Sequence, residues 1–256
     1  LTKHLTRLNE AMHILLNKGQ TTQQSASRSP TPPEGLQAAS MDIRAVESEK
    51  AVAIPPVVMV LQLTLRHEFG VFSAQFSPNG RRIVTAGAGG TARVWDATTG
   101  TLLGEPLRHN SGVVSWAQFS PDGAHIVTAS WDKTASVWDA ATGKPIGEPL
   151  HHEGEVNCAQ FSADGMRIVT ASRDMTARVW DSAICKPLGD PLRHEGQVWS
   201  AQFNPDGTRI VTASSDKTAR VWNTANGTPI GEPLRHEDNV VSAQFSADGM
   251  RIVTAS

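Results

Sequence analysis

An internal repeat is the feature that most constrains how this chain of 256 residues can fold. The triplet A-Q-F occurs five times, beginning at Ala74, Ala117, Ala159, Ala201 and Ala243. The triplet V-T-A follows each copy, ending at Ala86, Ala129, Ala171, Ala213 and Ala255. A Trp closes each of the first four units, at Trp95, Trp138, Trp180 and Trp222, with spacings of 43, 42 and 42 residues. Such a period is typical of helical repeats and of propeller blades.

Local composition favours the blade. Each unit holds four short runs rich in Val, Ile, Thr, Phe and Trp, separated by turn-forming residues. In the fourth unit these predicted strands are Val198–Phe203, Arg209–Ser214, Thr218–Trp222 and Thr228–Glu232. The intervening tetrapeptides N-P-D-G, S-S-D-K and T-A-N-G contain the residues that tight turns require. None of the runs has the length and the 3.6-residue period of a helix, so each unit is predicted to be a four-stranded antiparallel meander.

The inner runs indicate how the meanders pack. Runs such as I-V-T-A-S place small or apolar side chains on both faces, so both faces must be covered. Radial stacking of the sheets covers them, as in a propeller. The outer run P-I-G-E-P-L contains two Pro and a charge, which suits an outermost strand. The sequence therefore predicts an all-β propeller with four full blades and a partial fifth.

The sequence resembles the WD40 (Trp-Asp) repeat propellers over about Leu65–Ser256. The segments R-H-E-G-Q-V-W-S-A-Q-F-N-P-D-G and I-V-T-A-S-S-D-K-T-A-R-V-W-N follow the family pattern along their whole length. The near identity of the units also resembles bacterial or fungal arrays of this family. The expected repeats span about 65–106, 107–149, 150–191 and 192–233, with a partial repeat at 234–256.

The repeat region amounts to about 4.6 units, whereas propellers have roughly four to eight blades. Two interpretations follow. Either the chain is a fragment of a longer protein, or it forms a closed or self-associating five-bladed form. In the second case Val57–Thr64 would supply a strand to the closing blade.

Each complete unit except the first carries a His, a Thr, an Asp and a Trp at fixed positions. A catalytic triad is one interpretation, but an active site is a single asymmetric constellation, whereas this set recurs. The family resemblance implies instead a buried hydrogen-bond chain with a structural role. The residues of these tetrads are His109, Thr128, Asp132 and Trp138; His152, Thr170, Asp174 and Trp180; and His194, Thr212, Asp216 and Trp222. The first unit has Gly89 at the Asp position, so a looser first blade is expected.

The resemblance also implies where partners dock, namely on the face around the central channel. The exposed positions there flank the first Val of the inner strand and precede the turn Asp. They are Phe72, Ala88, Val113, Ser115, Trp131, Glu155, Asn157, Arg173, Gln197, Trp199, Ser215, Asn239 and Val241. These positions differ between units whose other residues are almost the same, which favours a role in binding.

Among these positions, Trp131 and Trp199 are the favoured partner anchors, because Trp and Arg are enriched at binding hot spots. The alternative is that each Trp covers a neighbouring loop. Trp116 stands where other units have Ser or Cys, so it is expected to fill a gap between blades.

Outside the repeats, residues 1–19 have the apolar spacing of an amphipathic helix, and residues 20–56 read as a flexible linker before a propeller region at 57–256. The net charge of −2 argues against nucleic-acid binding. Two Cys and the absence of zinc-ligand spacing predict neither a disulfide framework nor a metal site, and no cofactor is expected. The apolar run Ala51–Leu63 is too short, and too broken by proline, to span a bilayer.

The expected function is a non-enzymatic, cytoplasmic scaffold or regulatory module that binds a protein or peptide partner on the rim of the channel. Self-association is expected if the ring is incomplete. The alternative is the C-terminal sensor part of a larger signalling enzyme of the kinase or nucleotide-binding oligomerisation type. A propeller enzyme would need unrepeated polar groups that converge on the channel, and the sequence presents no such group.

Overall fold

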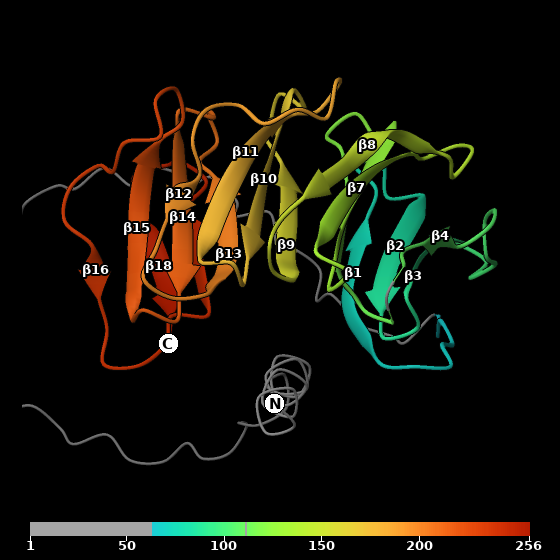
Figure 1. Cartoon of the computed structure of the whole chain (residues 1–256). Helices are drawn as coiled ribbons and strands as arrows, with labels where there is room; N and C mark the ends of the chain where they lie inside the picture. Colours follow the sequence, from blue (N-terminus) through green and yellow to red (C-terminus); the bar gives the residue numbers. More distant parts are fainter. Residues whose placement is uncertain (1–62, 111) are drawn as a thin grey trace, which may run out of the picture. The chain divides into compact units, whose positions relative to one another are not determined.

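The computed structural model of the protein describes residues 63–110 and 112–256. Its regular elements are strands, arranged in four four-stranded antiparallel sheets and one two-stranded sheet, which we number blades one to five along the chain (Figure 1). This confirms the predicted all-β fold with four complete blades and a partial fifth. Within these residues no helix is long and apolar enough to cross a membrane. The predicted helix at 1–19, the linker at 20–56 and most of Val57–Thr64 lie outside the described residues.

In each complete blade every strand pairs with the next one along the chain. Blade one consists of β1 (Val71–Phe76), β2 (Arg82–Gly87), β3 (Thr91–Asp96) and β4 (Leu107–Arg108). Blade two consists of β5 (Val114–Phe119), β6 (His125–Ser130), β7 (Thr134–Asp139) and β8 (Pro145–His151). Blade three consists of β9 (Val156–Phe161), β10 (Arg167–Ser172), β11 (Thr176–Asp181) and β12 (Leu192–Arg193). Blade four consists of β13 (Val198–Phe203), β14 (Arg209–Ser214), β15 (Thr218–Asn223) and β16 (Leu234–Arg235), and blade five of β17 (Ser242–Phe245) and β18 (Ile252–Ala255).

The turn between the first two strands of a blade is fixed by its own side chains. In blade three, Ser162 Oγ donates to Asp164 Oδ1 at 2.5 Å, and the same carboxylate oxygen accepts the Met166 N–H at 2.9 Å. Gly165 between them has a φ of +72°, which glycine adopts without steric cost. The turn residues read from the sequence therefore position the hairpin as predicted.

The fourth strand differs from the prediction, which placed it at Thr228–Glu232 in blade four. Pro229 forms only an isolated bridge with Trp222, and the strand proper is the short β16. Gly231 between these segments has a φ of +72°, as the equivalent Gly147 of blade two has a φ of +66°. Pro233 then lacks the N–H that a ladder bond needs. Only in blade two is the run P-I-G-E-P-L one continuous strand, with an irregular register against β7.

The core consists of apolar clusters at the junctions between successive blades. Each blade offers a leading face to the blade before it and a trailing face to the blade after it. The leading face comprises Val, Ala and Phe of the first strand, Ile of the second and Trp of the third; in blade two these are Val114, Ala117, Phe119, Ile126 and Trp138. The trailing face comprises Val and Ala of the second strand, Ala and Val of the third and Leu of the fourth; in blade one these are Val84, Ala86, Ala92, Val94 and Leu107.

Trp116 lies against the clusters on both sides of blade three. The prediction that it fills a gap between blades is therefore confirmed.

Candidate partner-binding rim

Blades two, three and four each hold their tetrad in one hydrogen-bond chain. In blade three, Trp180 Nε1 donates to Thr170 Oγ1 at 2.8 Å, and this oxygen lies 2.7 Å from His152 Nε2. His152 Nδ1 lies 2.8 Å from Asp174 Oδ2. A carboxylate only accepts, so the imidazole proton sits on Nδ1, and Nε2 accepts from the threonine hydroxyl. The chains of blades two and four have the same order, with distances of 2.7 to 3.0 Å.

Each of these chains links the second and third strands of its blade to the loop that enters the blade. Thr170 is fully buried, and its oxygen is already occupied by both the indole and the imidazole. Asp174 also accepts the Glu153 N–H at 3.1 Å and the Thr176 hydroxyl at 2.6 Å. Each carboxylate thereby ties the loop that enters the blade to the turn between its second and third strands.

The tetrad carboxyls titrate below their ordinary range. Burial alone would raise the pKa of Asp216, but hydrogen bonds from Thr218 and His194 outweigh it and lower the pKa to about 2. The same balance lowers the pKa values of Asp132 and Asp174. Burial lowers the pKa of the His194 imidazole by more than the neighbouring Asp216 raises it.

These shifts predict loss of stability in acid. A lowered pKa in the folded state means that the unfolded chain binds protons first, so the free energy of unfolding falls as the pH falls. We expect a shallow decrease below about pH 6.5 from His194 and a steeper one below about pH 4 from the carboxyls. Urea unfolding at pH 7, 5.5 and 3 measures both, with Asp216→Asn as the comparison variant. The steep decrease should be smaller in that variant, and an equal decrease in both proteins would contradict the assignment.

Blade one lacks the carboxylate, as the sequence indicates. Trp95 Nε1 still donates to Thr85 Oγ1 at 2.8 Å, but His67 Nε2 is buried without a hydrogen-bond partner. Burial lowers the pKa of His67, and the charge of Arg93 lowers it further. The tetrad of blade one is therefore incomplete.

A second departure in blade one accompanies the first. Phe69 stands where blade three has Gly154, at which a Cβ would come within 2.6 Å of the Asp174 nitrogen. In blade one the Phe69 ring lies over Gly89, where a Cβ would approach it to 2.9 Å. The Phe69 ring fits because residue 89 has no Cβ. Both departures, Phe69 and Gly89, can be read in the sequence.

Four of the variable rim residues, one from each of the first four blades, meet in one stack. The Arg173 guanidinium lies over both the Trp131 ring, with 4.7 Å from Cζ to the ring centroid, and the Trp199 ring, at 5.6 Å. Phe72 also contacts Trp131, with ring centroids 6.2 Å apart. We call these four residues the rim stack. All four are partly exposed.

Two further predicted residues position the central arginine. Arg173 Nη1 pairs with Glu155 Oε2 at 2.5 Å, and Arg173 Nε donates to Asn157 Oδ1 at 3.4 Å. The Asn157 amide in turn donates to the backbone oxygen of Val198 in blade four at 2.9 Å. The arginine is thus held by its own blade as well as by the two indoles.

The other predicted rim residues have no ring or cation–π contact with the stack among the described residues. Ser115 bonds to the backbone of blade three, through Val156 O at 2.8 Å. Asn239 and Val241 are exposed on blade five, and Val113, Gln197 and Ser215 lie partly exposed on blades two and four. The backbone oxygen of Val113 accepts the Trp131 N–H, and the backbone oxygen of Gln197 accepts the Ser215 N–H.

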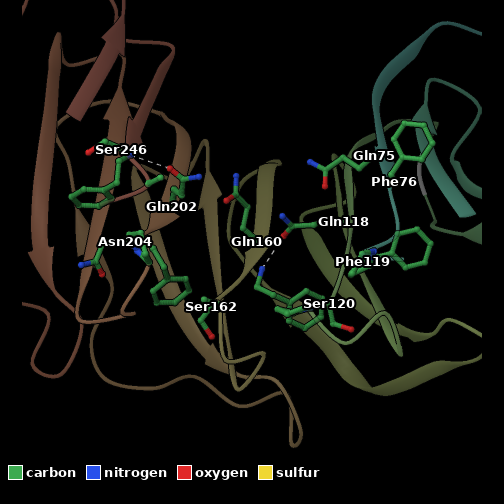
Figure 2. A pocket seen from close by; sticks show the side chains of 18 residues that line it. Gln75, Phe76, Gln118, Phe119, Ser120, Gln160, Ser162, Gln202, Asn204 and Ser246 are labelled. Atoms are coloured by element: carbon green, nitrogen blue, oxygen red, sulfur yellow. Dashed lines mark hydrogen bonds between the residues drawn. The ribbon is translucent and has the colours of Figure 1, made fainter. Parts of the chain in front are cut away.

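Sequence reasoning did not single out the glutamines of the A-Q-F triplets. In Figure 2 the side chains of Gln75, Gln118, Gln160 and Gln202 extend from neighbouring blades toward a common space lined also by phenylalanines. Gln118 Oε1 accepts the Phe161 N–H at 3.0 Å, and Gln202 Oε1 accepts the Phe245 N–H at 3.2 Å. Their repetition could have been noticed, but their role across the blade junction needed the structure.

The cysteines offer no reactive thiolate. Both are free and buried. Burial raises the pKa of Cys158 to about 11 and also raises that of Cys185. Since the thiolate is the nucleophile, neither thiol is suited to covalent catalysis at neutral pH.

Comparison with known proteins agrees with this architecture. The family model described as WD domain, G-beta repeat matches residues 59–96, 100–139, 143–181 and 185–223. Each match ends just after a closing Trp, at the Asp or Asn that follows it. No curated protein matches the chain. WD40 repeats are generally protein-interaction modules, and the family is typically non-enzymatic. Because the matches are consecutive and cover more than half of the sequence, the chain belongs to the WD40 repeat family.

Proposed function

We propose that this propeller is a non-enzymatic, cytoplasmic scaffold or regulatory module whose protein partner docks across the rim stack. One observation carries the proposal: a guanidinium lies between two partly exposed indoles, on positions that change from blade to blade. Residues that serve the fold are nearly the same in every repeat, whereas the positions of the rim stack carry different residues in different repeats. A surface of Trp and Arg of this kind is typical of binding hot spots.

The charges at the rim favour one class of partner. The positive charge of Arg173 is paired with Glu155, so the stack presents aromatic surface with little net charge. A polyanion such as nucleic acid would need unpaired basic residues there. The arrangement fits an apolar or aromatic side chain of a peptide or protein, which would remove the exposed ring surfaces from water.

We also propose that the molecule associates with itself. This is supported by large apolar side chains that remain exposed on the outward faces of blades one and five, among them Phe76 and Val253. Exposed apolar surface of this kind marks interaction sites in soluble proteins.

Removing one indole of the rim stack is expected to abolish most partner binding. Peptides selected from a random display library on the full chain supply the ligand, and titration gives the dissociation constant. Trp199→Ala should weaken binding by roughly 30-fold, which corresponds to about 2 kcal/mol. Arg173→Ala should act in the same direction, because it removes the group that both indoles contact.

Ile184→Ala serves as the matched control. Ile184 is 63% exposed but lies in the turn after β11, outside the rim stack. It should leave the affinity unchanged. Equal affinities for Trp199→Ala and Ile184→Ala would refute the rim as the binding surface.

A further inference from the structure

An arginine crosses the junction between successive blades at three places. It is the first residue of the second strand, and its guanidinium lies over the Phe that ends the first strand of the following blade. The pairs are Arg82 with Phe119, Arg167 with Phe203 and Arg209 with Phe245, with 5.1, 5.3 and 5.7 Å from Cζ to the ring centroid. Arg82 also donates to the carbonyl oxygens of Gly123 and Ala140, each at 2.7 Å. A guanidinium is therefore a regular component of these junctions.

The junction between blades two and three differs, because β6 begins with His125 where β2, β10 and β14 begin with an arginine. An imidazole is shorter than an arginine side chain, and among the described residues no cation lies over Phe161, the ring at this junction. The carbonyls equivalent to the two that the arginine of blade one contacts belong to Gly165 and Ser182. The Ser182 hydroxyl donates to Gly165 O at 2.7 Å, so it replaces one hydrogen bond of the guanidinium but neither its volume nor its charge.

A cavity of about 810 Å³ lies at this junction, and its lining includes His125, Gly165 and Ser182. The cavities at two junctions that keep the arginine are smaller, with about 440 Å³ beside Arg167 and about 310 Å³ beside Arg82. The largest of the three cavities thus lies where a histidine replaces the arginine, next to the carbonyls that correspond to the acceptors of a guanidinium in blade two.

The lining of this cavity is acidic. It includes the carboxylates of Asp122, Asp164 and Asp181, and the described residues that line it include no lysine or arginine. Of these three carboxylates, only that of Asp164 has an ion pair within the described chain, with Arg167 at 3.5 Å. The described residues contain no group of His, Cys, Asp and Glu side chains that could hold a metal ion. The charge of the lining therefore favours an organic cation.

Apolar side chains complete the lining, among them Pro121, Ile146 and Met166. The methylene stem of an arginine packs against such surface while its charged head stays among polar groups. Met166 is 70% exposed, so a side chain can enter from solvent. A planar guanidinium with five N–H donors suits carbonyl and carboxylate acceptors beside a ring better than an ammonium does.

We propose that this cavity binds the arginine side chain of a partner polypeptide, whose guanidinium takes the place over Phe161 that the protein's own arginines take at the other three junctions. It would donate to the carbonyl oxygens of Gly165 and Ser182 and lie among the carboxylates of the lining. The site lies where β6 begins, whereas Trp131 of the rim stack follows the end of β6. The two sites are therefore separate, and this one does not depend on the proposed function.

Calorimetric titration of the full chain with the tripeptide Gly-Arg-Gly, blocked at both ends, tests the site. The wild-type protein should show saturable binding, and the same tripeptide with lysine in place of arginine should bind roughly 10-fold more weakly. The variant His125→Arg supplies the guanidinium from within the chain. It should bind the arginine peptide at least roughly 10-fold more weakly than the wild type does, while its resistance to urea is undiminished.

Two further variants control for charge. Ala124→Arg adds the same charge at an exposed neighbouring position outside the lining, where blade one carries Arg81, and should leave the affinity unchanged. Asp181→Asn removes one carboxylate of the lining and should weaken binding roughly 3-fold. The turn should survive this change, because Asn223 of blade four stands at the same position and accepts the Ala225 N–H at 2.9 Å.

Equal affinities of the wild type and His125→Arg for the arginine peptide would overturn the site. So would the absence of saturable binding to the wild-type protein, or equal affinities for the arginine and lysine peptides. Circular dichroism checks that each variant folds. If His125→Arg does not fold, an unchanged affinity in Asp181→Asn contradicts the proposal by itself.

Discussion

Replacing Asp174 by Ala should lower the free energy of unfolding by about 3 kcal/mol, because the change leaves the donors of the buried residues His152 and Thr176 without their acceptor. The carboxylate accepts from His152 at 2.8 Å, from the Thr176 hydroxyl at 2.6 Å and from the Glu153 N–H at 3.1 Å. Its side chain is only 6% exposed, so water cannot replace these bonds without opening the blade. Urea unfolding followed by Trp fluorescence measures the loss.

Asp164→Ala is the control for this prediction. Asp164 also accepts hydrogen bonds, but its side chain is 46% exposed in a surface turn of the same blade. Water can solvate the donors that it leaves, so the cost should stay near 1 kcal/mol. Equal losses for the two variants would show that the tetrad is no more important to stability than an ordinary turn.

Replacing Phe203 by Ala should cost about 4 kcal/mol, in the range for deleting a buried aromatic ring. Phe203 is 7% exposed, lies in the cluster between blades three and four, and is covered by Arg167, whose Cζ lies 5.3 Å from the ring centroid. The same substitution at Phe76 should cost less than about 1 kcal/mol in dilute protein, because that side chain is 66% exposed. Unfolding of the two variants in urea gives the comparison.

The Phe76 variant is a close control, since both residues end the first strand of a blade in the triplet A-Q-F. Similar costs at the two positions would mean that burial between blades does not determine the stability of the propeller. Such a result would also show that the leading face of blade one is covered in dilute solution.

Much of the fold could be predicted from the sequence, because the repeat imposes the same local chemistry five times. The predicted first and second strands of blade four, Val198–Phe203 and Arg209–Ser214, coincide with β13 and β14. The third extends one residue further, to Asn223. Alternating apolar residues and turn residues such as Gly207 determine the local structure, so the strands and turns can be predicted from a single repeat.

The fourth strand could not be predicted as well. Pro, Gly and a charge in one short run are compatible with an edge strand or with a broken one, and the run itself does not decide between them. In blade two the same run remains continuous, although Gly147 also has a positive φ. The outcome depends on contacts around each run that its own residues do not specify.

The rim was predicted as a set of positions but not as a stack. The sequence indicates that Trp131, Arg173 and Trp199 vary against a constant framework, yet they lie 26 to 68 residues apart from one another. That the guanidinium lies over both indoles depends on how blades two, three and four are placed side by side. Pairing with Glu155 depends on a rotamer that no pattern of residues records.

The central claim is that positions shared between the repeats stabilise the propeller, whereas variable positions bind the partner. Its most direct test is the substitution Trp199→Ser. Serine is the residue that blade two carries at the equivalent position, Ser115. Stability and peptide binding are then measured on the same protein. We predict a free energy of unfolding within about 1 kcal/mol of the wild-type value, together with a roughly 30-fold loss of affinity for the selected peptide. Unchanged affinity, or a loss of stability as large as that from Asp174→Ala, would contradict the division between framework and rim.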